Sequence, residues 1–290
     1  MDENGSDKLT QSIGIIGAGT MGRGIAQICA SSGIDATLCD LDQAQLDGAR
    51  NSIETGYARM VQRDRMGEAD AQAALSRLSF ATGLDALAGS SLTIEAATEM
   101  PEVKLPLFEK IAEVCGDDAI LASNTSSISL TRIAAAVPRP ERVIGMHFFN
   151  PVPVMQLLEI VRALQTSDAT YNVACEVAER LNKTHVTVSD SPGFVVNRIL
   201  LPMVNEAVLS LAEGLATAEE IDVAMRLGAN HPMGPLALAD LIGLDVCLYV
   251  METLYEQFGD SKYRPAPLLR KMVDAKYLGR KTGRGFFTYG

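Results

Sequence analysis

The chain has 290 residues, 47% of them hydrophobic and 21% charged, which suffices for a sizeable core or for two domains that share an interface. Its formal net charge of −11 argues against a nucleic-acid binder, because such a protein needs a dominant basic face. No apolar run approaches the roughly 18 to 20 residues that span a bilayer, so we expect no membrane segment. The polar, acidic start from Met1 to Gln11 lacks a secretory or transit pattern, which predicts a cytoplasmic protein.

The cysteines are scattered along the chain without a CxxC pair, and each lies inside an apolar pattern. Such placement is typical of small buried residues rather than of disulfides or metal ligands. We therefore expect no metal site. The residues are Cys29, Cys39, Cys115, Cys175 and Cys247.

From Ser12 to about Asp190, short apolar runs alternate with amphipathic segments of helical period, the pattern of a parallel sheet covered by helices. The expected strands are Ser12–Gly17, Asp35–Asp40, Leu92–Ala97, Ala119–Ser123, Val143–Phe149, Gln156–Val161 and His185–Ser189. The sequence thus predicts an α/β dinucleotide-binding domain over residues 1–190, with a doubly wound (Rossmann-type), mostly parallel sheet that the last two strands extend.

The strand signals stop after Ser191-Pro192-Gly193. Long segments of helical period then cover about Phe194–Glu213 and Pro235–Phe258. Between them, Thr217 and Glu220 form a capping-box pattern that opens a short helix ending near Gly228. We therefore expect a second, all-helical domain over residues 191–290.

A G-x-G-x-x-G pattern of Gly17, Gly19 and Gly22 directly follows the first apolar strand and precedes a helix. Gly17 permits the tight turn, Gly19 lets the backbone approach a pyrophosphate, and Gly22 allows close packing of helix on strand. Asp40 ends the next strand near the ~20-residue distance expected of a carboxylate that binds the ribose, which favours NAD over NADP. The alternative is a purely structural glycine turn beside a solvated aspartate.

Removing hydride from a secondary alcohol requires a base for the hydroxyl proton, and histidine, with an ordinary pKa of about 6.5, suits that task near neutral pH. The chain has three histidines. His147 ends a predicted strand at the carboxyl edge of the sheet, where open α/β folds bind their ligands. His185 begins a late strand, and His231 precedes Pro232 in a turn between helices, where a capping or surface role is expected.

Glu159 lies twelve residues after His147, beyond the turn-forming Pro151 and Pro153, in an otherwise apolar strand. A buried carboxylate is costly unless it is paired, and pairing with the imidazole would fix its tautomer and stabilise its charged form. The sequence therefore predicts a His147–Glu159 pair. The alternative is a core histidine with an unrelated glutamate at a strand edge.

Five motifs, spread over nearly the whole chain, resemble the L-3-hydroxyacyl-CoA dehydrogenase family, and within it most closely the bacterial 3-hydroxybutyryl-CoA dehydrogenases. They are Gly17-Ala18-Gly19-Thr20-Met21-Gly22, Ser123-Asn124-Thr125-Ser126-Ser127, His147-Phe148-Phe149-Asn150-Pro151, Pro192-Gly193-Phe194-Val195-Val196-Asn197-Arg198 and His231-Pro232-Met233-Gly234-Pro235. The resemblance implies reversible, NAD-dependent oxidation of an (S)-3-hydroxyacyl-CoA, of short chain such as 3-hydroxybutyryl-CoA, to the 3-oxoacyl-CoA, a reaction of fatty acid metabolism.

The resemblance also implies roles for single residues. His147 would take the 3-hydroxyl proton and Glu159 would hold the imidazole. Ser126 would hydrogen-bond the substrate oxygen, Asn150 would lie near the nicotinamide, and Asn197 would position the thioester from the helical domain. The further cofactor-binding residues implied are Thr20 and Met21 of the glycine turn, Glu99, Lys104 and Lys281.

The sequence departs from many relatives at Met100, where they have an asparagine after the glutamate. Pro101 follows, and a proline at the first helical position is ordinary, so it is expected to open a helix toward Cys115.

Coenzyme A carries phosphates, and an acidic protein must hold them with a local basic cluster. Arg59 and Arg63 are four residues apart and would share a helix face, with Arg65 nearby, and family members place basic residues in this region against the CoA. The alternative is a solvated face balanced by Asp64 and Glu68.

These features and the resemblance together predict a 3-hydroxyacyl-CoA dehydrogenase with its active site between the two domains and a homodimer formed through the helical one. Two alternatives stay open. A β-hydroxy-acid dehydrogenase of free acids shares the glycine turn but generally relies on a lysine base, and a non-catalytic nucleotide-binding or structural relative would keep the fold alone.

Overall fold

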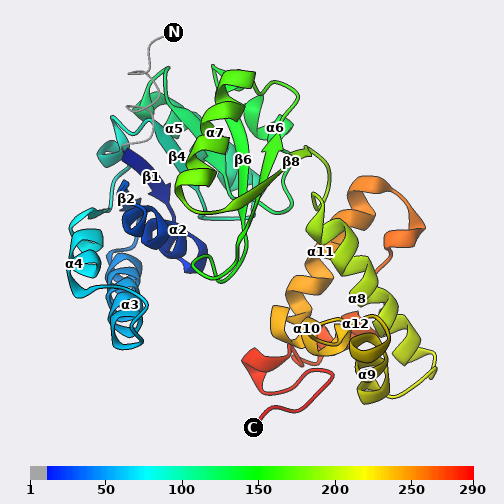
Figure 1. Ribbon diagram of the computed structural model, residues 1–290. Coiled ribbons are helices and arrows are strands. Elements are labelled where there is room, and N and C mark those ends of the chain that lie inside the picture. Colours follow the sequence, from blue (N-terminus) through cyan, green and yellow to red (C-terminus); the bar gives the residue numbers. More distant parts are fainter. Residues whose placement is uncertain (1–11) are drawn as a thin grey trace. The chain divides into compact units, whose positions relative to one another are not determined.

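The computed structural model describes residues 12–290, so the polar start of the chain, residues 1–11, lies outside the described part (Figure 1). The chain divides into two compact units, whose boundary in the sequence falls between Asp190 and Ser191. Each unit has its own hydrophobic core. Within residues 12–290, we find no helix long and apolar enough to cross a membrane.

Unit 1 is built on an eight-stranded sheet of order β3-β2-β1-β4-β5-β6-β7-β8. Neighbouring strands are parallel except for β6 and β7, which run antiparallel. The order reverses between β1 and β4, and open α/β sheets bind their ligands at such a switch point. The strands are β1 (Ser12–Ile16), β2 (Asp35–Cys39), β3 (Leu78–Ala81), β4 (Leu92–Glu95), β5 (Ile120–Ser123), β6 (Val143–Phe148), β7 (Leu157–Arg162) and β8 (Thr184–Ser189). The predicted doubly wound, mostly parallel sheet is confirmed.

The apolar runs predict every strand except β3, and the expected ends differ from the observed ones by one or two residues. In β3, Ser79 is exposed and the other residues are only partly buried. A strand so short and so open at the sheet edge produces no apolar run, which is why the sequence did not reveal it.

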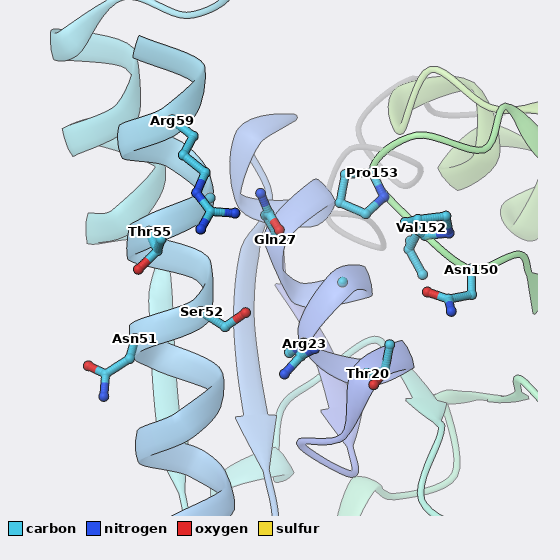
Figure 2. A pocket seen from close by; sticks show the side chains of 13 residues that line it. Thr20, Arg23, Gln27, Asn51, Ser52, Thr55, Arg59, Asn150, Val152 and Pro153 are labelled. Atoms are coloured by element: carbon cyan, nitrogen blue, oxygen red, sulfur yellow. The ribbon is translucent and has the colours of Figure 1, made fainter. Parts of the chain in front are cut away.

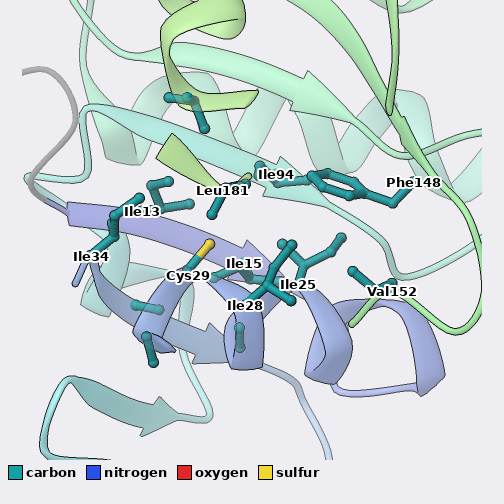
Figure 3. Close-up of a cluster of buried hydrophobic side chains, with 14 of the residues drawn as sticks. Ile13, Ile15, Ile25, Ile28, Cys29, Ile34, Ile94, Phe148, Val152 and Leu181 are labelled. Atoms are coloured by element: carbon teal, nitrogen blue, oxygen red, sulfur yellow. The ribbon is translucent and has the colours of Figure 1, made fainter. Parts of the chain in front are cut away.

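Helices cover the sheet of unit 1, and alternate strand residues on one face form a core with them. Ile13 and Ile15 of β1 pack there with Ile25 and Ile28 of α2, and Phe148 of β6 joins the same cluster (Figure 3). The helices are α2 (Thr20–Ser31), α3 (Gln43–Gln62), α4 (Glu68–Ser76), α5 (Pro101–Cys115), α6 (Leu130–Ala134) and α7 (Asp168–Arg180). Residues of opposite parity on the same strands point to the other face, where His147 and Glu159 lie.

Local signals fix where several of these helices begin. The Asp42 side chain accepts a hydrogen bond from the backbone of Ala44 (2.9 Å) at the start of α3. Ser167 caps α7 through the backbone N–H of Thr170 (3.1 Å). Pro101 occupies the first turn of α5, as its position in the sequence predicts.

Unit 2 is helical, and residues 191–290 contain no strand, only two isolated β-bridges. The Thr217–Glu220 capping box is present, and its helix ends at Gly228 as predicted. The helices are α8 (Val196–Ala212), α9 (Ala218–Gly228), α10 (Pro235–Ile242), α11 (Leu244–Phe258) and α12 (Pro267–Asp274). Apolar residues from α8 to α12 form a core of their own.

The expectation of one segment of helical period over Pro235–Phe258 is wrong in one respect. The helix ends at Ile242 and a new one begins at Leu244, because Gly243 has a φ of 106°. That conformation is open to glycine but strained for other residues, and it cannot continue an α-helix. The apolar period runs on through the break and conceals it.

The five cysteines are free thiols. Cys29, Cys39 and Cys247 are buried, and burial raises the pKa of Cys29 and of Cys247 to about 12 and that of Cys39 to about 11. Cys115 and Cys175 are only partly buried, so the prediction of buried thiols is right for three residues and too strong for two.

Candidate active site

The glycine turn joins β1 to α2, and each glycine meets a different steric demand. Gly17 has a φ of 98°, and a Cβ there would lie 2.7 Å from the Cα of Ala97. A Cβ on Gly22 would lie 1.8 Å from the carbonyl oxygen of Gly17. At Gly19 no heavy atom of the described residues, apart from Gly19 itself and its two chain neighbours, lies within 4 Å of the Cβ position, so the backbone is open to a ligand there. The first and third glycines therefore serve packing, and the second leaves room for a phosphate.

Asp40 follows β2 directly and is held against this turn. One carboxylate oxygen accepts a hydrogen bond from the backbone N–H of Ala18 (2.7 Å), and the other accepts one from Asp42 (3.0 Å). The side chain is partly exposed. The structure therefore brings the predicted ribose carboxylate beside the predicted phosphate turn.

His147 and Glu159 are direct partners in the antiparallel register of β6 and β7. Their Nδ1 and Oε2 atoms lie 2.7 Å apart, and the side chains are 8% and 0% exposed. The imidazole also contacts the ring of Phe149, with centroids 4.6 Å apart. The predicted pair is thus present, and His147 lies near the carboxyl end of β6, at the same sheet edge as the glycine turn.

The Glu99 carboxylate accepts hydrogen bonds from the loop after β5, which carries Ser126. Its carboxylate accepts hydrogen bonds from the hydroxyls of Thr125 (2.7 Å) and Ser127 (2.9 Å) and from the backbone N–H of Ser126 (3.1 Å). The structure brings two of the predicted site residues, Glu99 and Ser126, into direct contact.

Lys104, which is predicted to contact the cofactor, pairs with a buried carboxylate. Only 1% of the residue is exposed, and its ammonium pairs with Glu95, which is fully buried. The ammonium also lies 3.2 Å from the hydroxyl of Ser123. An ammonium has three N–H donors, so these two partners do not exclude a ligand, and cofactor contact by Lys104 stays a prediction.

A pocket of about 590 Å³ lies between α2, α3 and the turn after β6. It is lined by three predicted residues, Thr20, Arg59 and Asn150. Arg23 of α2 also lines it, and Figure 2 shows Arg23 and Arg59 extending into the space between the two helices. Sequence reasoning missed Arg23, although a basic residue in the helix after a glycine turn was a usable signal.

Arg63 does not join this pocket. The helix α3 ends at Gln62, and Arg63 follows it as an exposed capping residue. The helix face that Arg59 and Arg63 were expected to share therefore stops short of Arg63, because the helix does not persist that far.

Two further predicted residues belong to unit 2. Asn197 lies in the first turn of α8 and is partly buried. The ammonium of Lys281 lies 2.6 Å from both carboxylate oxygens of Asp245. Burial by itself raises the pKa of Asp245, but the hydrogen bond and charge of Lys281 outweigh it and leave that pKa below its ordinary value.

A glycine turn at the switch point of the sheet, the nearby carboxylate of Asp40 and a buried histidine–carboxylate pair at the same edge define a dinucleotide-binding protein of the Rossmann class. Residues 12–191 match the family model described as "3-hydroxyacyl-CoA dehydrogenase, NAD binding domain", and residues 193–289 match "3-hydroxyacyl-CoA dehydrogenase, C-terminal domain". The chain therefore belongs to the 3-hydroxyacyl-CoA dehydrogenase family, as the motifs predict, and its N-terminal domain is the NAD-binding domain of that family.

Individual relatives are similar over almost their whole length. The chain is 50% identical to a probable 3-hydroxybutyryl-CoA dehydrogenase of Deinococcus radiodurans, covering 95% of this chain and 99% of the relative. It is also 50% identical to a 3-hydroxybutyryl-CoA dehydrogenase of Bradyrhizobium diazoefficiens, covering 97% and 96%. The crystal structure of (S)-3-hydroxybutyryl-CoA dehydrogenase from Ralstonia eutropha is similar with a TM-score of 0.95 and 51% identity, covering 97% and 99%.

Proposed function

We propose that this protein catalyses the reversible NAD-dependent oxidation of (S)-3-hydroxyacyl-CoA to 3-oxoacyl-CoA, with 3-hydroxybutyryl-CoA as its short-chain substrate. The observation that carries the proposal is the buried His147–Glu159 pair at the carboxyl edge of a dinucleotide-binding sheet. The names of its relatives supply the substrate class.

His147 is the general base of the proposed reaction. Its Nδ1 is engaged by Glu159, so Nε2 is the nitrogen that accepts the proton of the 3-hydroxyl group. The glycine turn and Asp40 would hold NAD, which would supply the acceptor for the hydride that leaves C3 as the hydroxyl oxygen becomes a carbonyl. Glu159 fixes the tautomer and stabilises the positive charge that His147 acquires.

The pocket between α2 and α3 is the proposed site of the CoA phosphates. Arg59 and Arg23 bring two positive charges to its wall, and guanidinium groups suit phosphate oxygens. Asn150 lines the same pocket and follows the strand that carries His147. This placement supports a substrate whose thioester end reaches His147 while its nucleotide end stays near α3.

The remaining roles are part of the same proposal. Ser126 hydrogen-bonds the substrate oxygen, Glu99 holds Ser126 in place, and Asn197 and Lys281 act from unit 2 on the thioester and the cofactor.

We further propose a homodimer that forms through unit 2. Exposed apolar side chains there, such as Ile199, Leu215 and Leu227, would be covered by a second copy. Light scattering on the protein as it elutes from a size-exclusion column should then give a mass twice the chain mass of 31.0 kDa. A mass of one chain at micromolar concentration would contradict the dimer.

An assay of NADH absorbance tests the activity. We expect acetoacetyl-CoA to be reduced with NADH, with much slower turnover of free acetoacetate or with NADPH, and longer 3-oxoacyl-CoAs report the chain-length preference. Equal rates with free acetoacetate would favour a free-acid dehydrogenase, and no turnover of any substrate would favour a non-catalytic relative.

Substitution of the proposed base gives the matched control. His147→Gln should abolish turnover and leave NADH affinity nearly intact, because the imidazole transfers a proton and does not hold the dinucleotide. His185→Gln changes a histidine in β8 and should retain wild-type kcat. A His147→Gln variant with wild-type kcat would contradict the assignment of His147 as the general base.

A further inference from the structure

The chain between β6 and β7, residues 149–156, which we call the β6–β7 loop, forms one wall of the pocket that α2 and α3 complete (Figure 2). Residues 150–153 of this loop line the pocket. Within the loop, the backbone N–H groups of Val154 and Met155 both donate to the carbonyl of Pro151 (2.9 and 3.0 Å). These two bonds shape the loop, but they do not attach it to the rest of unit 1.

Lys183 supplies an attachment from the segment just before β8. Its ammonium donates hydrogen bonds to the backbone carbonyls of Val152 (2.7 Å) and Met155 (2.6 Å). Lys183 is only 8% exposed, and burial lowers its pKa because a charged ammonium is costly away from water. A buried ammonium and a buried carbonyl each require a partner, so the lysine and the loop depend on each other.

The backbone of Lys183 is itself fixed at the junction of α7 and β8. Asn182 has a φ of 53°, and the N–H of Lys183 donates to the carbonyl of Ala178 (2.9 Å), the bonding of a Schellman motif at a helix end. The next residue, Thr184, donates to the carbonyl of Gln156 (2.9 Å), where the loop ends. Lys183 is therefore a firm point from which the loop can be held.

On its other side the loop packs on α2. The Val152 side chain is 2% exposed and joins the core that contains Ile25 of α2 (Figure 3). A Cβ built on Gly24 of α2 would lie only 2.9 Å from the Cβ of Val152, so the two backbones approach as closely as a glycine allows. Val152 is thus held twice, by its side chain on α2 and by its carbonyl at Lys183. Both contacts set the distance of this wall from Arg23.

We propose that Lys183 is a positioning residue that holds the β6–β7 loop against α2, so that the pocket keeps the shape in which it takes the phosphates of CoA. The inference rests on the proposed function, which places those phosphates beside Arg23 and Arg59. Lys183 acts on the substrate through the carbonyls of Val152 and Met155. Without Lys183, the buried Val152 carbonyl loses its donor, and the loop leaves α2 in part of the molecules.

Steady-state kinetics of Lys183→Met test this. The apparent affinity for a ligand falls with the fraction of molecules that can bind it, so the KM for acetoacetyl-CoA should rise about tenfold, equivalent to about 1.4 kcal/mol. Saturating substrate selects molecules with the loop in place, so kcat should fall by less than about threefold. Lys110→Met removes an exposed lysine from α5 and should leave both constants unchanged.

A shorter substrate separates the pocket from the rest of the site. Acetoacetyl-pantetheine carries the same thioester but lacks the nucleotide and its phosphates. Its KM should therefore differ by less than about twofold between Lys183→Met and the wild type, because it does not use the pocket wall. An equal rise of KM for both substrates would overturn the proposal. So would a fall in Tm with a wild-type KM for acetoacetyl-CoA, since that result indicates a merely structural role.

Hydrogen exchange follows the loop without reference to activity. The amides of Val154 and Met155 should exchange faster in Lys183→Met than in Lys110→Met. A lysine that bound a phosphate directly through its third N–H would raise KM and leave this exchange unchanged, and that result would overturn the proposal. Wild-type protein that reduces no acyl-CoA would contradict the proposed function, while the exchange result still decides whether Lys183 holds the loop.

Lys183→Gln is the second variant if Lys183→Met does not fold. Its amide is uncharged and one bond shorter, and a neutral donor makes a weaker hydrogen bond than an ammonium, so the KM for acetoacetyl-CoA should rise about threefold. The amides of residues 154 and 155 should again exchange faster than in Lys110→Met. A Lys183→Gln variant with wild-type KM and wild-type exchange would refute the proposal equally.

Discussion

The charge of Glu159 is the feature whose removal gives the most informative experiment. Glu159→Gln keeps a side chain of the same length, with an oxygen that can still accept a hydrogen bond from Nδ1 of His147, but it removes the negative charge. In the wild-type protein that oxygen lies 2.7 Å from Nδ1, and Glu159 is fully buried. The variant therefore isolates electrostatic support of the imidazolium from its orientation.

The expected magnitude follows from the geometry. Two unit charges with centres about 4 Å apart attract each other by about 4 kcal/mol at an effective dielectric constant near 20. Since about 1.4 kcal/mol corresponds to a factor of ten in rate, loss of the whole interaction would lower kcat by about a thousandfold. Only part of the charge on His147 has developed in the transition state, so we expect a fall of about a hundred- to a thousandfold.

The assay is the initial rate of NADH formation from 3-hydroxybutyryl-CoA and NAD at saturating concentrations. The NADH Kd should stay close to that of the wild type. Asp168→Asn removes a carboxylate that is 86% exposed and should leave kcat unchanged. A Glu159→Gln variant with kcat within about threefold of the wild type would refute the argument, because the missing attraction would then be worth less than about 0.7 kcal/mol.

Three further predictions follow from single contacts. Gly22→Ala should weaken NADH binding at least about tenfold in a fluorescence titration, because its Cβ would lie 1.8 Å from the Gly17 carbonyl oxygen, whereas Gly48→Ala meets nothing within 4 Å among the described residues and should bind normally. Thr217→Ala removes a capping box and should lower the free energy of unfolding of unit 2 by about 1 kcal/mol in urea. Burial raises the pKa of Cys29 from an ordinary 9.0 to about 12, so the native thiol should resist iodoacetamide at pH 8. The contribution of the protonated Cys29 thiol to the free energy of unfolding should be fully present below pH 9 and decline toward pH 12. Urea denaturation midpoints measured at both pH values test this.

The sequence predicts most of the fold because the central strands β4, β5 and β6 are buried on both faces, and strands of that kind consist of apolar runs. Its failures occur where local pattern and tertiary structure disagree. The edge strand β3 has one exposed and three partly buried residues, and the helical period around Gly243 continues through a backbone break. Neither feature changes hydrophobicity enough to be seen without the surrounding structure.

The site is predictable to the extent that its residues are adjacent in sequence or in strand register. The glycine turn is local, and its steric demands follow from the motif. The sequence did not indicate that Arg23 lines the pocket, because this depends on how α2 faces α3. Nor did it indicate that Arg63 lies outside the pocket, because this depends on where α3 ends. The packing of the helices determines such relations, and local sequence patterns do not specify that packing.

The rule that singled out Glu159 applies equally to Glu95, since both are carboxylates in otherwise apolar strands and both require a partner. The antiparallel turn brings His147 opposite Glu159, and the helix after β4 brings Lys104 to Glu95. The two pairs differ in access, because the His147 side chain is 8% exposed at the sheet edge and that of Lys104 only 1%. A histidine near the surface can exchange a proton with a substrate, whereas the enclosed pair joins the end of β4 to α5. Access, rather than the presence of a buried carboxylate partner, therefore distinguishes the proposed base from the enclosed lysine.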